Sequence, residues 1–173
     1  MKYVAFIFAR GGSKGVARKN LQEIGGVSLV GRAVRQALAA DKISKVIIST
    51  DDQEIADEAV RFGAECPFIR PANLAADTSK EWDAWKYTVR HLREIGEEFD
   101  VFVSVPATSP LRKPADIDRA IELYDQGDVE VVVTGKQADR SPYFNMVQKD
   151  AEGNVSLVCD SNISRRQDVP VVY

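Results

Sequence analysis

The stretch KYVAFIFARGGSKGVARKN, residues 2–20, decides the fold of this 173-residue chain. Its first part, Tyr3–Ala9, is a continuous apolar run that ends at the charged residue Arg10. A strand that is covered on both faces of a sheet has this composition, because neither face meets water. The stretch therefore predicts a strand buried on both faces that is followed at once by a loop rich in glycine and positive charge.

Three further short runs of β-branched and apolar residues follow the first one. They are Lys45–Ser49, Asp100–Val105 and Glu130–Thr134, and segments with helical spacing lie between them. Alternating strands and helices are typical of parallel strands that are joined by helical crossovers. We therefore expect an α/β fold with a Rossmann-like, doubly wound, mainly parallel sheet.

Four segments have apolar residues on one helical face. Their stripes are Leu29, Val30, Ala33, Val34, Ala37 and Leu38; Ile55, Ala56, Ala59 and Val60; Trp82, Trp85, Val89 and Leu92; and Ile117, Ala120, Ile121 and Tyr124. Gly63 and Gly127 are placed to end the second and fourth helices. Thr78–Glu81 has the pattern of a capping box at the start of the third helix, and Pro114 suits the first turn of the fourth.

The alternation stops after about Gly135. Pro142–Gln148 and Asn154–Val158, separated by KDAEG, predict a C-terminal hairpin extension outside the sheet. An isolated two-stranded hairpin is marginal in water, so its apolar side chains need a partner surface. That surface is either the sheet of the same chain or a second copy in a homodimer.

Composition excludes several classes of function. The chain has 23 Lys and Arg against 26 Asp and Glu, a net charge of −3, which does not indicate a binder of nucleic acid. Cys66 and Cys159 lie far apart without the spacing of a zinc site or a disulfide framework. No apolar run has the length of a signal peptide or a membrane span. We expect a soluble cytoplasmic protein.

The loop after the first strand, residues 10–20, has the residue types of a phosphate site. Ligands of open parallel sheets bind beyond the carboxyl ends of the strands, where this loop lies. Gly11, Gly12 and Gly15 let backbone amides approach an anion closely. Four cationic side chains accompany them: Arg10, Lys14, Arg18 and Lys19. The loop lacks the patterns of a P-loop and of a dinucleotide site, and the alternative interpretation is a surface turn with solvated charges.

Five motifs carry a resemblance to a known family. They are ARGGSKGVARKN (9–20), ISTDDQEIADEA (48–59), FIRPANLAADTS (68–79), TSPLR (108–112) and RRQDVPVVY (165–173). With them the sequence resembles the acylneuraminate cytidylyltransferases, or CMP-sialic acid synthetases, including relatives that act on other nonulosonic acids. The resemblance implies a single domain over residues 1–173 with a fold of the nucleotide-diphospho-sugar transferase type. It also implies transfer of CMP from CTP to the anomeric hydroxyl of a nine-carbon-type sugar acid, with release of pyrophosphate.

The resemblance also implies roles for individual residues. It puts Arg10, Gly11, Gly12, Ser13, Lys14 and Lys19 at the phosphates of CTP, with Arg10 and Lys14 as the catalytic cations, Asn20 at the nucleoside and Arg70 at the cytidine portion. The alternative role of Arg70 is an ion pair at a helix end or on the surface. Arg166 and Gln167 match positions near the sugar acid or a phosphate, and their alternative is a polar loop.

The implied reaction needs no protein nucleophile, because positioning, cations and Mg²⁺ can neutralise the charge of the leaving pyrophosphate. The pair Asp51-Asp52 invites assignment as a metal site, but it is better interpreted as a helix N-terminus. Family members continue past the position of Tyr173 and supply aspartates for magnesium there. We therefore expect the metal ligands beyond Tyr173 and a chain that is incomplete at its C-terminus.

Two other functions stay open. Family members often have a glutamine and a proline before TSPLR, where this chain has Pro106-Ala107, so the identity of the sugar is not fixed. A Kdo-type cytidylyltransferase is one alternative. A non-catalytic nucleotide-binding or assembly module of the same fold is the other. The family commonly dimerises through an element inserted after the fourth helix, with residues such as Arg166 reaching towards the neighbouring site.

Overall fold

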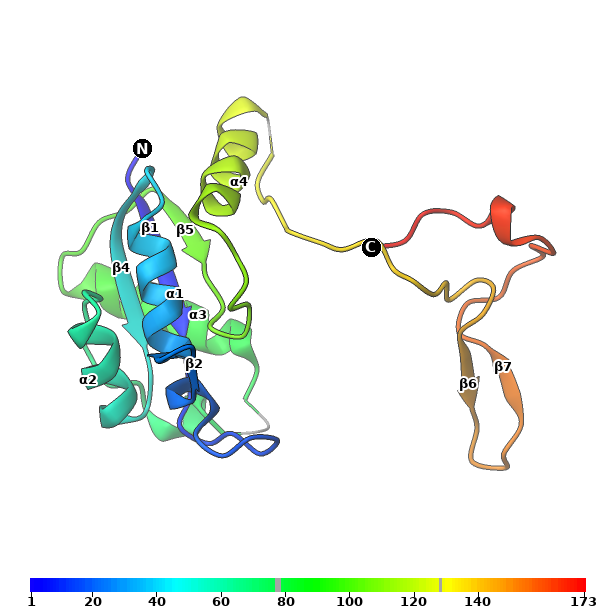
Figure 1. Cartoon of the computed structure of the whole chain (residues 1–173), viewed down its shortest axis with the longest axis horizontal. Helices are drawn as coiled ribbons and strands as arrows, with labels where there is room; N and C mark the ends of the chain where they lie inside the picture. The colour runs from blue at the N-terminus through cyan, green and yellow to red at the C-terminus, as the bar shows by residue number, and fades with distance from the viewer. Residues whose placement is uncertain (77–78, 128) are drawn as a thin grey trace. The chain divides into compact units, whose positions relative to one another are not determined.

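The computed structural model of the protein describes residues 1–76, 79–127 and 129–173 (Figure 1). They form two compact units, Met1–Glu130 and Val131–Tyr173. The N-terminal unit holds the sheet and its helices, and the C-terminal unit holds a hairpin. Each unit is described here by itself.

The N-terminal unit is built on a three-stranded parallel sheet in the order β4-β1-β5. The strands are β1 (Tyr3–Phe8), β4 (Ile43–Ser49) and β5 (Val101–Ser104). β1 pairs with β4 along its whole length and with β5 through its first four residues. The predicted mainly parallel sheet is therefore confirmed, and three of the four predicted strands match within two residues at each end.

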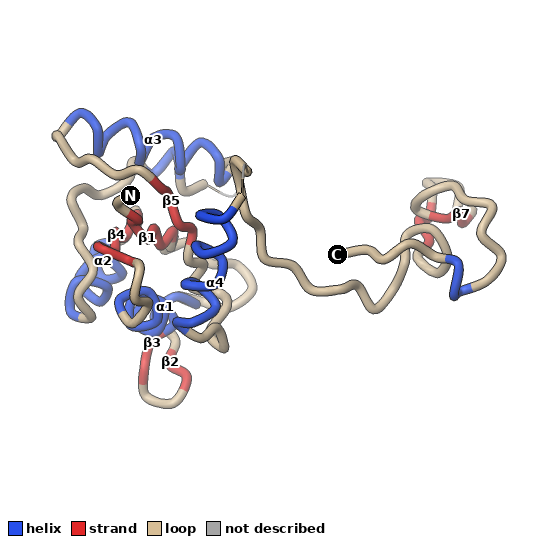
Figure 2. The backbone as a smooth tube through the Cα atoms, turned by 90° about the horizontal axis from the view of Figure 1, so that it is seen from above, coloured by secondary structure: helices blue, strands red, loops and turns tan. Residues whose placement is uncertain are grey.

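Both faces of β1 are buried, which explains why its sequence is continuously apolar. Ala5 and Ile7 face a cluster formed with helices α1 (Leu29–Leu38), α2 (Gln53–Arg61) and α4 (Pro114–Gln126), whereas Val4 and Phe6 face α3 (Glu81–Glu94). Figure 2 shows α3 on one side of the strands and the other three helices on the opposite side. Helices on both faces are the mark of a doubly wound sheet, as predicted.

Short elements complete the unit. They are the 3-10 turns η1 (Lys19–Leu21) and η2 (Ala72–Leu74), and a small hairpin of β2 (Glu23–Ile24) and β3 (Val27–Ser28). The predicted helix ends are confirmed at three positions. Gly63 follows α2 with a φ of +103°, α4 begins at Pro114, and Gly127 follows its last residue.

Three of the predicted core positions are wrong. Leu38 and Val60 lie near the C-terminal ends of α1 and α2 and are about half exposed. Trp82 is 61 % exposed because the buried face of α3 is formed by Ala84, Thr88 and Leu92. Trp82 lies in the first turn of α3, outside that face, and its ring packs on Trp85 alone among the described aromatic contacts.

The predicted capping box at the start of α3 falls partly on residues 77–78, which lie outside the described residues. The hydroxyl of Ser79 donates to the carbonyl of Asn73 (2.7 Å) and does not cap the helix. Lys80 occupies the N-cap position without a side-chain hydrogen bond to the helix. Ser79 therefore stabilises the segment before α3 and does not cap the helix. Neither Ser79 nor Lys80 forms the predicted capping interaction.

The predicted strand Glu130–Thr134 is also wrong. These residues form no strand in the described part of the chain, and Val131 and Val133 are 71 % and 83 % exposed. A β-branched run fits a sheet only where a neighbouring strand can pair with it, and the residues described here offer no such pairing. The sequence pattern of Glu130–Thr134 predicted a tendency to form a strand, but it could not predict whether a neighbouring strand was there to pair with it.

The C-terminal unit contains the predicted hairpin in a shorter form. Its strands are β6 (Val147–Lys149) and β7 (Val155–Leu157), and a 3-10 turn, η3 (Arg166–Asp168), follows them. Val147 pairs with Leu157, and Lys149 pairs with Val155. One face of the hairpin is therefore mostly apolar, because residues two apart and their cross-strand partners share a face.

Candidate active site

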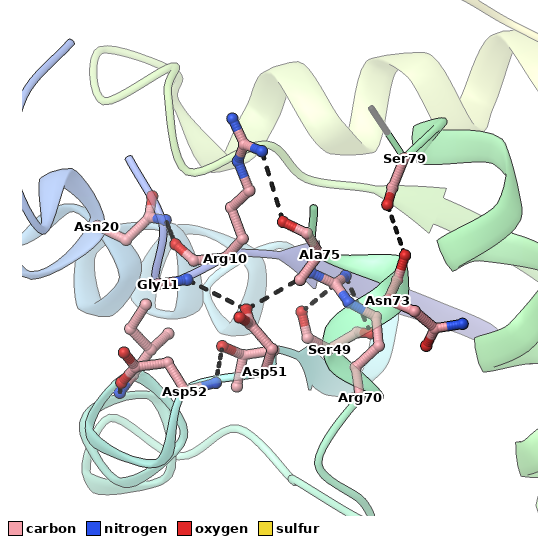
Figure 3. A network of polar contacts seen from close by, with 12 residues as sticks. Arg10, Gly11, Asn20, Ser49, Asp51, Asp52, Arg70, Asn73, Ala75 and Ser79 are labelled. Atoms are coloured by element: carbon pink, nitrogen blue, oxygen red, sulfur yellow. Dashed lines mark hydrogen bonds and ion pairs between the residues drawn. The ribbon is translucent and has the colours of Figure 1, made fainter. Parts of the chain in front are cut away.

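The candidate active site lies where the strands of the parallel sheet end. Three segments meet there: the loop of residues 10–20 after β1, the turn of residues 50–52 after β4, and residues 70–76 (Figure 3). The backbone amide of Ala9 donates to the carbonyl of Ser49 (3.2 Å), and that of Arg70 donates to the carbonyl of Thr50 (2.7 Å). We call residues 10–20 the opening loop.

The opening loop is held at both of its ends. Asn20 is buried, and its side-chain amide donates to the backbone carbonyl of Arg10 (3.0 Å). The guanidinium of Arg10 reaches the carbonyl of Ala75 at 3.5 Å, and the amide of Ser13 donates to the carbonyl of Gly11 (3.0 Å). Asn20 thus closes the base of the loop, and Arg10 spans from the loop to η2.

Two glycines of the opening loop have different surroundings. A Cβ at Gly11 would lie 2.5 Å from Oδ2 of Asp52, so Gly11 is needed for close packing. A Cβ at Gly12 would meet nothing within 4 Å, and Gly12 is exposed. The space around the backbone of Gly12 is therefore open to a ligand.

Arg18 has a role that its charge alone did not predict. Its guanidinium donates to Asp52 (3.1 Å) and Glu54 (2.6 Å) at the start of α2, and these carboxylates raise the pKa of Arg18. Its φ of 48° places it in the left-handed region, just before η1. Arg18 therefore links the opening loop to α2.

Asp51 and Asp52 are adjacent in the chain but contact different parts of the structure: Asp52 contacts α2, and Asp51 contacts the opening loop. Asp52 is the N-cap of α2, because its carboxylate accepts from the amide of Ile55 (3.2 Å), as predicted. The carboxylate of Asp51 instead accepts from the amide of Gly11 (3.1 Å). The interpretation of the pair as a helix N-terminus is therefore correct for Asp52 and incomplete for Asp51, whose contact comes from a loop 40 residues earlier in the chain.

Arg70 is a buried cation beside the opening loop. Its Nη1 lies 3.4 Å from the carbonyl and 3.5 Å from Oγ of Ser49, and its Nη2 lies 4.0 Å from Asp51. Its Nε is buried without a hydrogen-bond partner in the described part of the chain. Burial lowers the pKa of Arg70, an effect that the charge of Asp51 opposes. Burial argues against the surface ion pair that was one alternative for Arg70, whereas the contact with Asp51, just before α2, is consistent with the other alternative, an ion pair at a helix end.

Arg166 and Gln167 lie in η3 of the C-terminal unit, and both are exposed. Arg166 lines a shallow hollow of about 170 Å³ together with Arg140 and Asn145. Two guanidinium groups and an amide around one hollow suit an acidic ligand. Sequence reasoning did not single out Arg140, because 26 residues separate it from Arg166.

The carboxylates of the candidate site accept hydrogen bonds from protein donors. Asp51, Asp52 and Glu54 accept from Gly11, Ile55 and Arg18, as described above. Within residues 1–76, 79–127 and 129–173, no three acidic, histidine or cysteine side chains gather as metal ligands.

None of the helices in those ranges is long and apolar enough to cross a membrane.

A doubly wound sheet with a glycine-rich, cationic loop after its central strand is typical of nucleotide-binding proteins of the α/β class. A sequence model of the family described as cytidylyltransferase matches residues 4–170. The chain belongs to this family, and the resemblance noted in its motifs is confirmed.

Three relatives indicate which branch of the family is similar. The chain is 35 % identical to the post-translational flagellin modification protein B of Campylobacter coli, over 96 % of this chain and 71 % of that protein. It is 30 % identical to a CMP-N,N'-diacetyllegionaminic acid synthase of Legionella pneumophila, over 90 % and 66 %. It is 28 % identical to a pseudaminic acid cytidylyltransferase of Campylobacter jejuni, over 100 % and 75 %.

Solved structures share the fold. A CMP:2-keto-3-deoxy-manno-octonic acid synthetase complexed with CTP has a TM-score of 0.61 and 21 % identity. A 4-diphosphocytidyl-2C-methyl-D-erythritol synthase of Anaerococcus prevotii has a TM-score of 0.58 and 13 % identity. The match to the first covers 73 % of this chain and 48 % of that one. The chain thus spans about half the length of that structure.

Proposed function

We propose that this protein transfers CMP from CTP to the anomeric hydroxyl of a nonulosonic acid. The sugar oxygen forms a bond to the α-phosphorus, the bond from that phosphorus to the bridging oxygen of pyrophosphate breaks, and the hydroxyl proton is released. The observation that carries the proposal is the opening loop, with its accessible Gly12 backbone and exposed Lys14, next to the buried Arg70. Membership of the cytidylyltransferase family supports it.

The nucleotide would lie along the opening loop. Arg10, Lys14 and Lys19 carry positive charges that would neutralise the triphosphate, and Ser13 and the amides of Gly12 and Gly15 would add hydrogen bonds, whereas the Gly11 amide is bonded to Asp51. Neutralising the phosphates as pyrophosphate leaves lowers the barrier, so Arg10 and Lys14 would be the catalytic cations. Asn20, the last residue of the loop, and Arg70, next to the loop, are both buried, which suits recognition of the nucleoside and its base.

The sugar acid would be bound by Arg166 and Gln167. The hollow that Arg166 shares with Arg140 supports this assignment, because a carboxylate is recognised well by guanidinium groups. The relatives named for legionaminic and pseudaminic acids favour a nonulosonic acid as the substrate. A Kdo-type sugar acid is the alternative substrate, because the CMP:2-keto-3-deoxy-manno-octonic acid synthetase that shares the fold is named for such a sugar.

Mg²⁺ is the proposed cofactor, and when bound it would neutralise the charge of the triphosphate. No step above depends on the metal. The cytoplasm is the proposed location. A non-catalytic nucleotide-binding module of the same fold is the second candidate.

CTP turnover with Mg²⁺ tests the proposal. The protein, in its full natural length, is incubated with CTP and with legionaminic, pseudaminic, sialic or Kdo acids, and released pyrophosphate is measured. We expect release with at least one nonulosonic acid, and none when ATP, GTP or UTP replaces CTP. Tight CTP binding without turnover on any acid would support the non-catalytic module, and turnover on Kdo alone would support the Kdo-type enzyme.

We also propose that the protein is a homodimer and that β6 and β7 form its interface. The face of the hairpin that carries Val147, Val155 and Leu157 is mostly apolar, with Lys149 as its one charged residue, whereas Gln148 and Ser156 lie on the other face. Val147 and Val155 are exposed. A two-fold axis would pack two such faces together and could complete each sugar site from both subunits.

A further inference from the structure

Asp51 lies between the opening loop and Arg70, and the proposed reaction does not use it. One oxygen of its carboxylate, Oδ1, accepts from the amide of Gly11 (3.1 Å) and lies 4.0 Å from Nη2 of Arg70 (Figure 3). We propose that Asp51 is a positioning residue, which holds the Gly11 amide and the Arg70 guanidinium at a fixed separation before nucleotide binds. This role rests on the proposed function, because it serves the CTP site.

Arg70 needs such a partner because it is a buried charge. Its side chain is 4 % exposed, and its contacts with Ser49 are at the long end of hydrogen bonding. Among the ion pairs of the described residues, Arg70 pairs with the carboxylate of Asp51. A buried cation that loses its counter-charge is strongly disfavoured, so without Asp51 the guanidinium would move or draw in water.

Asp51 can act as a fixed point because the turn that carries it is held from several sides. The backbone amide of Asp52 donates to Oγ1 of Thr50 (3.1 Å), and Thr50 is fully buried. The carboxylate of Asp52 binds the first turn of α2 and Arg18. A site held in its bound geometry loses less freedom when the ligand arrives, and therefore binds it more tightly.

A double-mutant cycle on CTP binding tests the role. The dissociation constant of CTP is measured by calorimetry for the unaltered protein, Asp51→Asn, Arg70→Met and the double variant. We expect Asp51→Asn to weaken binding roughly tenfold when Arg70 is present and less than about twofold when Met replaces it, because the two residues act as one unit. Asp57→Asn, which removes an exposed carboxylate of α2, is the matched control and should bind CTP normally.

Two results of the cycle would overturn the proposal. Equal weakening in both backgrounds would mean that Asp51 does not act through Arg70. Unchanged or tighter binding by Asp51→Asn would mean that Asp51 has no positioning role or that its charge opposes the triphosphate. If the unaltered protein does not bind CTP, the proposed function fails.

Hydrogen exchange in the unaltered protein tests Asp51 without any variant and without nucleotide. The amide of Gly11 is bonded to Asp51, whereas the amide of Gly12 has no hydrogen bond in the described part of the chain. We expect the Gly11 amide to exchange at least about tenfold more slowly than that of Gly12. Equal exchange rates would overturn the proposal even if Asp51→Asn could not fold.

Discussion

Lys14 is the exposed cation in the middle of the opening loop, and its replacement tests the loop at the scale of one residue. Lys14→Ala should reduce pyrophosphate release from CTP roughly a hundredfold or more, because it removes a charge that stabilises the transition state. Lys86→Ala removes a solvent-exposed ammonium group from α3 and serves as the control. Normal turnover by a folded Lys14→Ala protein would remove Lys14 from the mechanism.

Gly12 gives a test of backbone access. Gly12→Val should fold, since a Cβ there meets nothing within 4 Å, yet it should lose activity at least as strongly as Lys14→Ala because the side chain blocks the approach of phosphate to the backbone. Turnover and thermal unfolding are measured together. Gly11→Ala should instead lower the melting temperature, because its Cβ would lie 2.5 Å from Asp52. An active Gly12→Val protein would contradict the prediction.

At the scale of elements, Tyr3 joins the first residue of β1 to α4. Its hydroxyl donates to Asp125, which also pairs with Lys42 (2.8 Å) before β4. This hydrogen bond is the main reason that the pKa of Tyr3 is raised to about 12. The folded protein therefore holds the hydroxyl proton more tightly than the unfolded chain, whose tyrosines titrate near pH ~10.

The stability that this hydrogen bond contributes should fall as the pH rises. It is complete below pH ~10 and is lost between about pH 10 and about pH 12, because the unfolded chain releases the proton first. Urea midpoints measured from about pH 9 to about pH 11 should therefore decline more steeply for the unaltered protein than for Tyr3→Phe. Parallel declines would show that Tyr3 titrates alike in both states.

At the scale of the whole molecule, the mostly apolar face of the hairpin formed by β6 and β7 predicts that the protein is a homodimer. The unaltered protein at micromolar concentration should sediment at twice the 19.1 kDa mass of the chain. Val147→Asp should shift it to the monomer, because its cross-strand neighbour is the apolar Leu157 and a carboxylate buried there would lack a partner. Val60→Asp, on the exposed side of α2, should remain a dimer. A monomeric protein that still turns over CTP would refute the interface and the shared sugar site.

The sequence by itself determined the N-terminal unit and the position of the opening loop. Continuous apolarity of Tyr3–Ala9 reports burial on both faces, and Gly63 and Pro114 mark helix ends, because these signals depend on a residue and its near neighbours in the chain. The same locality explains the errors. Glu130–Thr134 has the composition of a strand, but composition does not supply a neighbouring strand.

Tertiary structure alone decided which charges meet. Asp51 and Gly11 are 40 residues apart, and Arg70 comes from a third segment, so their proximity follows from the pairing of β1 with β4. Arg18 is the same case: its sequence context suggested a ligand charge, yet the fold places it against Asp52 and Glu54. Charge is a property of the residue, whereas its partner is a property of the packing, and only the packing showed that Arg18 pairs with Asp52 and Glu54.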